Sequence, residues 1–204
     1  MTLITFEGGE GAGKTTLIEQ VFAYLKAEGF PVLHTRAPGG TPLGSALRHL
    51  LLDHPHTISS RAELFLFLAD RAQHVEEIIR PALQNEQIVL CDRFNDSTLA
   101  YQGARGFDTA WLQKLLSFAC AGITPQLTLY LDCPVEVGFQ RVQRSKDRIE
   151  SEERAFHEKI RSLFLQIAKQ EPSRFLPLDA MRSPQEVFSE AKKEIDALLA
   201  HPRK

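Results

Sequence analysis

The chain reads Gly8-Gly9-Glu10-Gly11-Ala12-Gly13-Lys14-Thr15 close to its N-terminus, a full match to the phosphate-loop pattern G-x-x-x-x-G-K-[ST]. The segment before it, Leu3-Ile4-Thr5-Phe6, is short, apolar and typical of a buried strand. After it, apolar residues recur at helical spacing from Leu17 to Leu25. The glycine-rich segment therefore stands between a strand and a helix, which is the context that phosphate binding requires.

A loop of this kind holds the phosphates of a nucleotide. Backbone N–H groups and the helix N-terminus surround the phosphate oxygens, the lysine reaches the β and γ groups, and the hydroxyl that follows it binds Mg²⁺. We expect the nucleotide-binding residues to be Gly8, Gly9, Glu10, Gly11, Ala12, Gly13, Lys14, Thr15 and Thr16, with Lys14 catalytic and Thr15 a metal ligand. The alternative is a glycine-rich turn with a solvated lysine, which the flanking strand and helix disfavour.

The composition favours one α/β domain, spanning residues 1–204, with small molecules as partners. The 24 basic and 26 acidic residues give a net charge of −2, so we expect no general attraction to nucleic acid or to an anionic membrane. No apolar stretch approaches the ~20 residues that span a bilayer, and no secretion signal precedes the first strand, so we expect a cytoplasmic protein. Cys91, Cys120 and Cys133 lack C-x-x-C spacing and have apolar neighbours, which favours buried free thiols over a redox or zinc site.

Five apolar, β-rich segments recur along the chain, at residues 3–6, 32–35, 88–91, 127–131 and 175–178. At least one helix-length segment separates each pair, a pattern typical of an α/β fold whose parallel sheet is covered by helices on both faces. We expect Ser60 and Glu63 to form a capping box for a helix that ends near Pro81, and Ser183 and Glu186 to cap the last helix. The charged segment after Arg141 loses its apolar periodicity, which predicts a short lid insert at about residues 142–154.

A phosphate loop alone is compatible with a small-molecule kinase, a GTPase switch or an ATPase motor. The N-K-x-D motif of GTPases is absent, and the third strand ends in Cys91-Asp92-Arg93 rather than in the D-E of many motors. Asp92 suits an acidic group near the metal. Arg93 follows a parallel strand and therefore points to the crevice where α/β sheets bind ligands. A surface salt bridge is the other interpretation of this pair, and the phosphate loop favours a functional one.

Phe67, Arg71 and His74 share one face of the expected long helix. An aromatic ring beside a guanidinium can stack on a nucleobase while the guanidinium donates hydrogen bonds to a base carbonyl. A core stripe is already provided by Leu64, Phe65, Leu68, Ala69, Ala72 and Val75, and Phe67 lies off its centre. Spacing alone favours neither of two interpretations. In the first, Phe67 and Arg71 bind a base; in the second, Phe67 is a core residue and Arg71 is solvated.

Motifs along the chain resemble those of the thymidylate kinases, in the order and spacing of that family. They are the phosphate loop through Thr16, Thr35-Arg36-Ala37-Pro38-Gly39-Gly40-Thr41, Phe67 with Ala69-Asp70-Arg71, Asp92-Arg93-Phe94 with Ser97-Thr98 and Ala100-Tyr101-Gln102-Gly103, and Asp147-Arg148-Ile149-Glu150. The resemblance implies a P-loop NTPase-type fold with a five-stranded sheet. It also implies ATP- and Mg²⁺-dependent transfer of the γ-phosphoryl group to dTMP by a homodimer, giving dTDP and ADP.

The resemblance also implies roles for individual residues. Phe67 is similar to the residue that stacks on thymine, Arg71 to the one that bonds its O4, and Arg36 and Arg93 to the arginines that hold the dTMP phosphate. The remaining contacts implied for dTMP are Tyr101 against the sugar, Thr98 and Gln102 as polar partners, and Glu10 near the sugar and the metal site. Two departures from the family pattern affect secondary contacts: Ala37 stands where many members carry Glu, and Phe94 where Tyr or His is common.

The acceptor phosphate is a dianionic nucleophile at neutral pH, because its second pKa is near ~6, so no general base is required. The protein must instead neutralise charge on the transferred group, through Lys14, Mg²⁺ and an arginine. The phosphate loop carries no arginine, whereas the lid segment is basic, with Arg141, Arg144, Lys146, Arg148 and Arg154. This resembles the family's subtype with an arginine-bearing lid. We expect Arg144 and Arg148 to be catalytic along with Arg93, and Arg141 and Arg154 to be solvated.

Two rivals remain at this stage. Another nucleoside monophosphate kinase, or a kinase acting on thymidine, would share the phosphate loop, but Arg36 and Arg93 favour an acceptor that already carries a phosphate. A regulatory protein that binds nucleotide without transfer would lack an acceptor pocket, so Phe67, Arg71 and Tyr101 argue against it.

Overall fold

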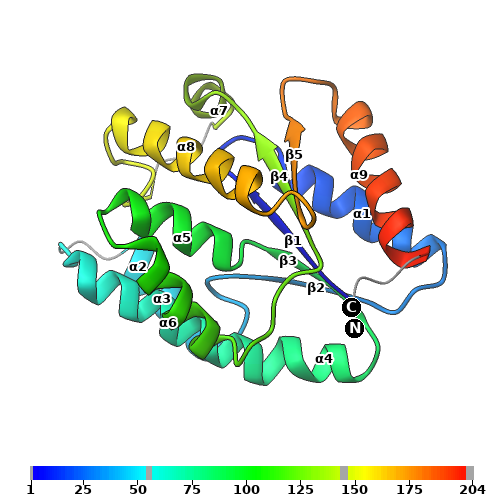
Figure 1. Cartoon of the computed structure of the whole chain (residues 1–204), viewed down its shortest axis with the longest axis horizontal. Coiled ribbons are helices and arrows are strands. Elements are labelled where there is room, and N and C mark those ends of the chain that lie inside the picture. The colour runs from blue at the N-terminus through cyan, green and yellow to red at the C-terminus, as the bar shows by residue number, and fades with distance from the viewer. Residues whose placement is uncertain (1, 54–56, 143–146, 201–204) are drawn as a thin grey trace.

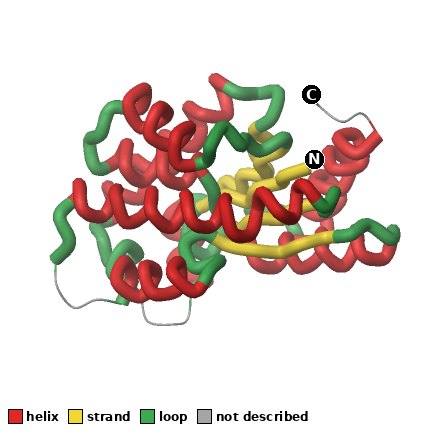
Figure 2. The backbone as a smooth tube through the Cα atoms, turned by 90° about the horizontal axis from the view of Figure 1, so that it is seen from below, coloured by secondary structure: helices red, strands yellow, loops and turns green. Residues whose placement is uncertain are grey.

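The computed structural model describes residues 2–53, 57–142 and 147–200. Its strands are β1 (Thr2–Gly8), β2 (Val32–Arg36), β3 (Ile88–Asp92), β4 (Leu127–Asp132) and β5 (Phe175–Asp179). They form one parallel sheet of order β2-β3-β1-β4-β5, so all five predicted strands and their direction are confirmed. The yellow strands lie side by side among the red helices in Figure 2. Phe6 of β1 and Arg36 of β2 both pair with Asp92 of β3, which brings the carboxyl ends of these strands to one edge.

Helices cover both faces of the sheet, as predicted (Figure 1). One face carries α1 (Lys14–Ala27) and α9 (Pro184–Ala200). The other carries α3 (Ser60–His74), α5 (Asn95–Ala104), α6 (Thr109–Ala119) and α8 (Arg154–Gln170). The remaining elements are α2 (Pro42–Leu52), the π-helical turn η1 (Val75–Ile79), α4 (Arg80–Gln84) and α7 (Val135–Arg141).

The two faces of β1 show why both layers form. Successive strand side chains point to opposite faces. Ile4 and Phe6 pack with α1 and α9, whereas Leu3 packs on the other side with Val75 and Ile79. Because both faces of the strand are apolar, burial on both sides is favourable, as is usual for parallel sheets.

The helix caps were predicted with mixed success. The box at the last helix is confirmed, because Glu186 N–H donates to Ser183 Oγ at 3.3 Å and Ser183 N–H donates to Glu186 Oε2 at 3.0 Å. The box at Ser60 is wrong. Ser59 caps α3 instead, accepting from the Ala62 N–H at 3.4 Å. Glu63 is buried among other partners.

The expected core stripe of α3 is also wrong in part. Leu64 and Val75 are buried, but Phe65 is 60% exposed and Ala69 is exposed. Helical geometry continues past His74 through the π turn into α4, whose first turn contains Pro81, so the helical segment ends at Gln84. The three cysteines are free and buried, as predicted. In the parts of the chain that the structure describes, no helix is both long and apolar enough to cross a membrane.

Candidate active site

The phosphate loop leaves β1 at Gly8 and enters α1 at Lys14. Its path requires glycines, because Gly11 and Gly13 have φ of 66° and 96°. A Cβ on Gly11 would also lie only 2.0 Å from the Gly138 carbonyl oxygen of α7. Lys14 Nζ donates to the Gly8 and Gly9 carbonyls at 3.0 and 2.9 Å, so its ammonium lies across the loop. Burial, together with the nearby Arg93, lowers the pKa of Lys14.

A cavity of about 680 Å³ opens beside this loop. It brings together most of the predicted site residues: Glu10, Gly11, Ala12, Gly13, Lys14, Thr15, Arg36, Phe67, Arg71, Asp92, Arg93, Thr98, Tyr101 and Gln102. Gly8, Gly9, Thr16 and Arg148 are not in its lining. Residues from the phosphate loop, α1, β2, β3, α3 and α5 thus meet at the carboxyl edge of the sheet, the usual ligand crevice of an α/β fold.

Arg93 lies at the centre of this arrangement. Its backbone is left-handed, with φ of 66°, and its N–H donates to the Phe6 carbonyl at 2.9 Å. Its guanidinium donates to Glu10 Oε1 at 2.6 Å and to Ser97 Oγ at 3.2 Å. The guanidinium carbon is 5.4 Å from the centre of the Tyr101 ring. Arg93 therefore connects the phosphate loop with the first turns of α5.

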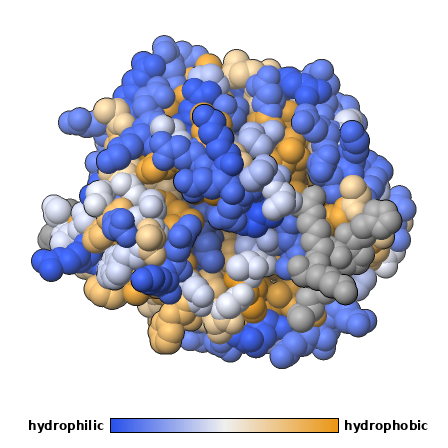
Figure 3. Space-filling view, in the orientation of Figure 1, coloured by the Kyte–Doolittle hydropathy of each residue, from blue (hydrophilic) through white to orange (hydrophobic). Residues whose placement is uncertain are grey.

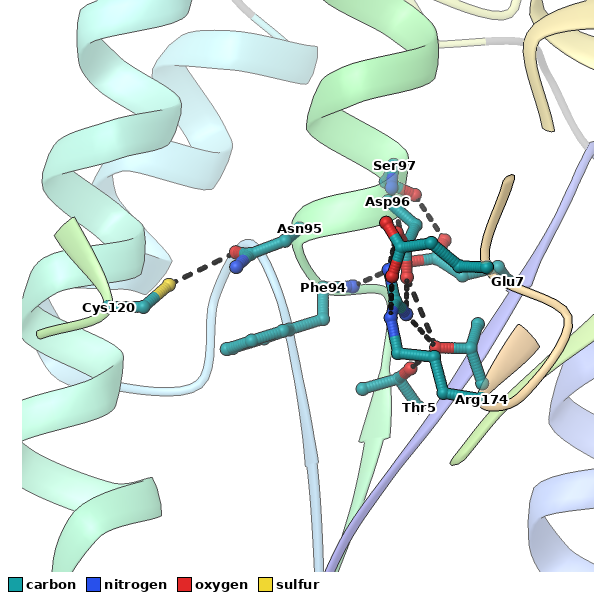
Figure 4. A network of polar contacts seen from close by, with 10 residues as sticks. Thr5, Glu7, Phe94, Asn95, Asp96, Ser97, Cys120 and Arg174 are labelled. Atoms are coloured by element: carbon teal, nitrogen blue, oxygen red, sulfur yellow. Dashed lines mark hydrogen bonds and ion pairs between the residues drawn. The ribbon is translucent and has the colours of Figure 1, made fainter. Parts of the chain in front are cut away.

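The start of α5 is fixed by Glu7, a residue that sequence reasoning missed (Figure 4). Glu7 accepts hydrogen bonds from the N–H groups of Phe94 at 2.7 Å and Ser97 at 3.1 Å, and from Ser97 Oγ at 2.5 Å. Burial, with Asp96 nearby, raises the pKa of Glu7 to about 7. A carboxylate at a helix N-terminus compensates its free N–H groups and its positive dipole end. The sequence feature that could have identified Glu7 is its position as a carboxylate inside an otherwise apolar strand.

Phe67 and Arg71 both line the cavity, so the two residues predicted to share a face do so at the site. Arg71 is only 3% exposed, and its guanidinium carbon lies 4.2 Å from the centre of the Phe94 ring. Its Nε and Nη1 have no hydrogen-bond partner among the described residues. Buried donors without partners are costly, so this guanidinium is suited to a ligand that brings acceptors.

His74, on the same helix face, has a structural role instead. It is absent from the cavity lining, and its Nε2 is 2.7 Å from Thr35 Oγ1. Burial lowers its pKa to about 4, so the ring is neutral. Asp70 contributes on the same side, accepting from the Gly39 N–H at 3.0 Å. Together these side chains hold the end of β2, which carries Arg36, and the segment that follows it.

Arg48 of α2 was not singled out from the sequence, although it lines the cavity. Its Nη1 donates to the Pro38 carbonyl at 3.0 Å. Burial and the proximity of Arg36 and Arg93 lower its pKa. Cations that approach one another in a half-buried site are stabilised by a polyanion between them. The sequence indicates a role for Arg48 only weakly, because helical spacing does not show which cationic residue of a helix faces a cavity.

The segment predicted to be a lid, at about residues 142–154, is described in part. Arg144 and Lys146 lie outside the described residues. Arg148 donates through Nε to the Leu51 carbonyl at 2.8 Å and through Nη2 to Glu63, so its guanidinium is turned away from the cavity. Arg154 is an exposed residue, as expected, near Glu136 and Glu158. Arg141 is exposed too, as expected, but it also lines the cavity and donates to the Ala180 carbonyl at 3.1 Å.

The arrangement places a triphosphate-binding loop and a basic second subsite in one cavity, at the edge of a parallel sheet. These features define a kinase of the P-loop class, in which catalysis depends on positioning and on charge stabilisation. The comparison with known proteins narrows this class to one family.

The family model for thymidylate kinase matches residues 6–191. The thymidylate kinase of Protochlamydia amoebophila is 50% identical over 92% of this chain and 89% of that protein. That of Desulfovibrio desulfuricans is 50% identical over 96% of this chain and 95% of that protein. The crystal structure of thymidylate kinase from Ehrlichia chaffeensis superposes with a TM-score of 0.78 at 33% identity, covering 95% of this chain and 98% of that one. The chain belongs to the thymidylate kinase family, whose members phosphorylate dTMP to dTDP with ATP.

Proposed function

We propose that the cavity binds both substrates, with the ATP phosphates at Gly8–Thr16 and dTMP against α3 and α5. The observation that carries this proposal is the single cavity that joins Lys14 of the phosphate loop with Phe67 and Arg71. The dTMP phosphate lies among Arg36, Arg48 and Arg93. The last of these is 2.6 Å from Glu10 of the loop, so the phosphate is next to the γ group that it receives.

The base is recognised by Phe67, Arg71 and Gln102. Arg71 carries donors without partners, and Gln102 Oε1 is an acceptor without a partner in the described residues. Thymine presents the complementary pair, the acceptor O4 and the donor N3–H. Cytosine presents the reverse pair, a donor amine and an acceptor N3, so the same groups discriminate against it.

The sugar packs against Tyr101, with Thr98 and Glu10 as polar neighbours. Burial raises the pKa of Tyr101 to about 12, so its hydroxyl stays protonated. The ring lies edge to face with Phe156, at 6.4 Å between centroids, so α8 supports it from behind. A rigid ring at this place disfavours the extra 2′-hydroxyl of a ribonucleotide.

The transfer needs charge compensation rather than a base. Lys14 and Arg93 stabilise the negative charge that spreads over the moving phosphoryl group. Thr15 and Asp92 are the residues that would hold Mg²⁺; both line the cavity, and Asp92 Oδ1 has no hydrogen-bond partner among the described residues. A hydroxyl and a carboxylate, completed by phosphate oxygens and water, suit this ion, which would supply positive charge that neutralises the phosphates.

The lid, at about residues 142–154, contributes a further arginine. Arg144 and Arg148 are the candidates, and the engagement of Arg148 with Glu63 favours Arg144 for the transferred group. Arg141 already lines the cavity from α7 and is suited to the ATP side. The arginine-bearing lid is consistent with a phosphate loop that has no arginine between Gly8 and Lys14.

The protein acts as a homodimer of one-domain subunits. Large apolar side chains are exposed on α3 and α6, namely Phe65 at 60%, Trp111 at 43% and Phe118 at 88%. Apolar surface appears at the lower left of Figure 3, over the region of these helices in Figure 1. Such surface is suited to a second copy, because exposed apolar patches mark interaction sites. Sedimentation of the wild type and of Phe118→Glu tests the dimer. A location in the cytoplasm, without nucleic-acid partners, stays a prediction.

A coupled assay of ADP release tests the substrate assignment. Acceptors are dTMP, dUMP, thymidine, dGMP and AMP, each at saturating ATP. We expect the highest kcat/KM with dTMP and little turnover with thymidine, because a neutral acceptor leaves the arginines of the phosphate subsite without an anion. Equal turnover of thymidine and dTMP would contradict the proposed acceptor site.

A further inference from the structure

Glu63 connects the acceptor side of the cavity with the segment that leads out of the lid. This residue of α3 is 2% exposed. Its Oε1 accepts from Gln102 Nε2 at 2.9 Å and from Arg105 Nε at 3.2 Å, and its Oε2 accepts from Arg148 Nη2. The carboxylate therefore receives two guanidinium groups and one amide, from two segments that are distant in the sequence, residues 102–105 and Arg148.

The charge state of the Glu63 carboxylate determines how the Gln102 amide is oriented. Burial alone would raise the pKa of Glu63, but the hydrogen bonds from Arg148 and Gln102 and the charge of Arg105 lower it overall. An ionised carboxylate has no donor, so Gln102 must turn its NH₂ group toward Glu63. The carbonyl oxygen of the same planar amide must then point the opposite way.

Gln102 is fully buried and contributes to the cavity lining. Its Oε1 has no hydrogen-bond partner in residues 2–53, 57–142 and 147–200. A buried acceptor without a partner is unfavourable, unless a ligand supplies a donor. The amide thus offers the cavity an acceptor only, and its orientation is set from behind by Glu63.

We propose that Glu63 is a positioning residue that determines base specificity, by fixing Gln102 as an acceptor toward a base that donates from its ring nitrogen. This inference rests on the proposed placement of the base near Arg71 and Gln102. Thymine and uracil carry a ring N3–H and fit the fixed acceptor. Cytosine has a lone pair at N3, which faces the lone pairs of Gln102 Oε1 and is repelled.

The decisive variant is Glu63→Gln. A glutamine side chain can donate as well as accept, so it allows the Gln102 amide to rotate and present its NH₂ group to cytosine N3. We expect the ratio of kcat/KM for dTMP over dCMP to fall about tenfold or more. The ratio for dTMP over dUMP stays unchanged, because these bases differ only in a methyl group far from N3. Titration calorimetry with dTMP and dCMP reports the same change in binding, without turnover.

Two matched controls separate positioning from general damage. Glu63→Asp keeps a carboxylate that only accepts, so the ratio for dTMP over dCMP is retained even if the protein is less stable. Arg105→Gln removes one of the ion pairs of Glu63, at 3.2 Å, without changing what the carboxylate can accept. We expect Arg105→Gln to retain the ratio of kcat/KM for dTMP over dCMP as well. If Glu63→Gln and Glu63→Asp lower the ratio equally, or if neither lowers it, the proposal is overturned.

A second route avoids dependence on a single fold-sensitive variant. Gln102→Met removes the acceptor, and we expect the same fall in the ratio; the double variant with Glu63→Gln then shows no further fall. Independent, additive losses would overturn the proposal. Failure of the underlying base placement is recognised separately, because a wild type that accepts dCMP as well as dTMP would contradict the site itself rather than the role of Glu63.

Discussion

The guanidinium of Arg71 lies 4.2 Å from the centre of the Phe94 ring, and the two side chains come from α3 and from the residue just before α5. Phe94 is fully buried, so its ring forms a fixed surface on which the planar guanidinium rests. The phenylalanine that departs from the family pattern therefore supports the arginine that we assign to the base. This contact explains how a cation that is 3% exposed keeps donors without partners pointing into the site.

Replacing Arg71 by Ala should raise KM for dTMP about tenfold or more, since a charged hydrogen bond to a base carbonyl contributes ~1.5–3 kcal/mol. KM for ATP should stay nearly unchanged, because the triphosphate is bound by the phosphate loop. Steady-state kinetics with each substrate varied in turn provides the measurement. If both constants rise together, Arg71 has a structural role.

Lys14→Ala should reduce kcat by more than about tenfold, because the ammonium follows the charge of the migrating group. The fold should persist, since the bonds of Lys14 Nζ within the described residues go to the Gly8 and Gly9 carbonyls, at 3.0 and 2.9 Å. Circular dichroism checks the fold alongside single-turnover kinetics. A variant with more than about a tenth of the wild-type kcat would contradict the assigned role.

Gly138→Ala should disturb the ATP side of the site from α7. A Cβ at this position would lie 2.2 Å from the Glu10 carbonyl oxygen, so the phosphate loop or the helix must move. We expect a higher KM for ATP, while KM for dTMP changes less. Gln140→Ala, an exposed position on the same helix, is the matched control. Unchanged ATP kinetics in Gly138→Ala would show that the loop accommodates the methyl group freely.

The fold could be predicted from the sequence because the apolar pattern of each strand agreed with the order of strands and helices along the chain. The central predicted strands are apolar on both faces, every strand is separated from the next by helical segments, and the phosphate loop fixes the first βα unit. The prediction of an apolar core stripe on α3 was wrong in part, and the reason is physical. Its buried face includes the polar residues Glu63, Asp70, Arg71 and His74, of which Arg71 lines the cavity, so the buried face is not the apolar one. Hydrophobic periodicity cannot find such a face.

The prediction of site residues succeeded or failed on similar grounds: residues within a local pattern were predicted, and residues that depend on tertiary contacts were not. Motif residues such as Lys14, Phe67 and Arg93 were predicted to lie at one site and do line one cavity, because their spacing or a family pattern carries the information. Glu7 and Arg48 were missed, since their importance comes from tertiary neighbours: helix N–H groups for the first and other arginines for the second. The cap at Ser59 was displaced by one residue because two serines stand side by side.

His74 should make stability depend on pH. Its pKa in the folded protein is about 4, below its ordinary value of 6.5, so the unfolded chain binds more protons between these values. Stability from this group is therefore present above pH 6.5 and decreases as pH falls toward 4, by roughly 2 kcal/mol at pH 5. Urea unfolding at pH 7 and pH 5 measures this. The loss should be smaller in His74→Asn and unaltered in His49→Asn, whose ring is exposed on α2. Equal losses in all three proteins would refute the assignment.

The lid arginines provide the most demanding test of the mechanism. If Arg144 stabilises charge that develops only during transfer, Arg144→Ala should lower kcat, with little change in the affinity for either nucleotide. Arg148→Ala should behave differently, because its guanidinium is bound to Glu63 and to the Leu51 carbonyl, at 2.8 Å for the latter. Its main expected effect is lower stability, since the buried Glu63 loses one of its two guanidinium partners and keeps only Arg105. Adding an arginine to the phosphate loop, as Ala12→Arg, to the Arg144→Ala protein should restore part of kcat if the two share one electrostatic task. Wild-type kcat in Arg144→Ala, Arg148→Ala and the double variant would leave the lid as a cover without catalytic charge.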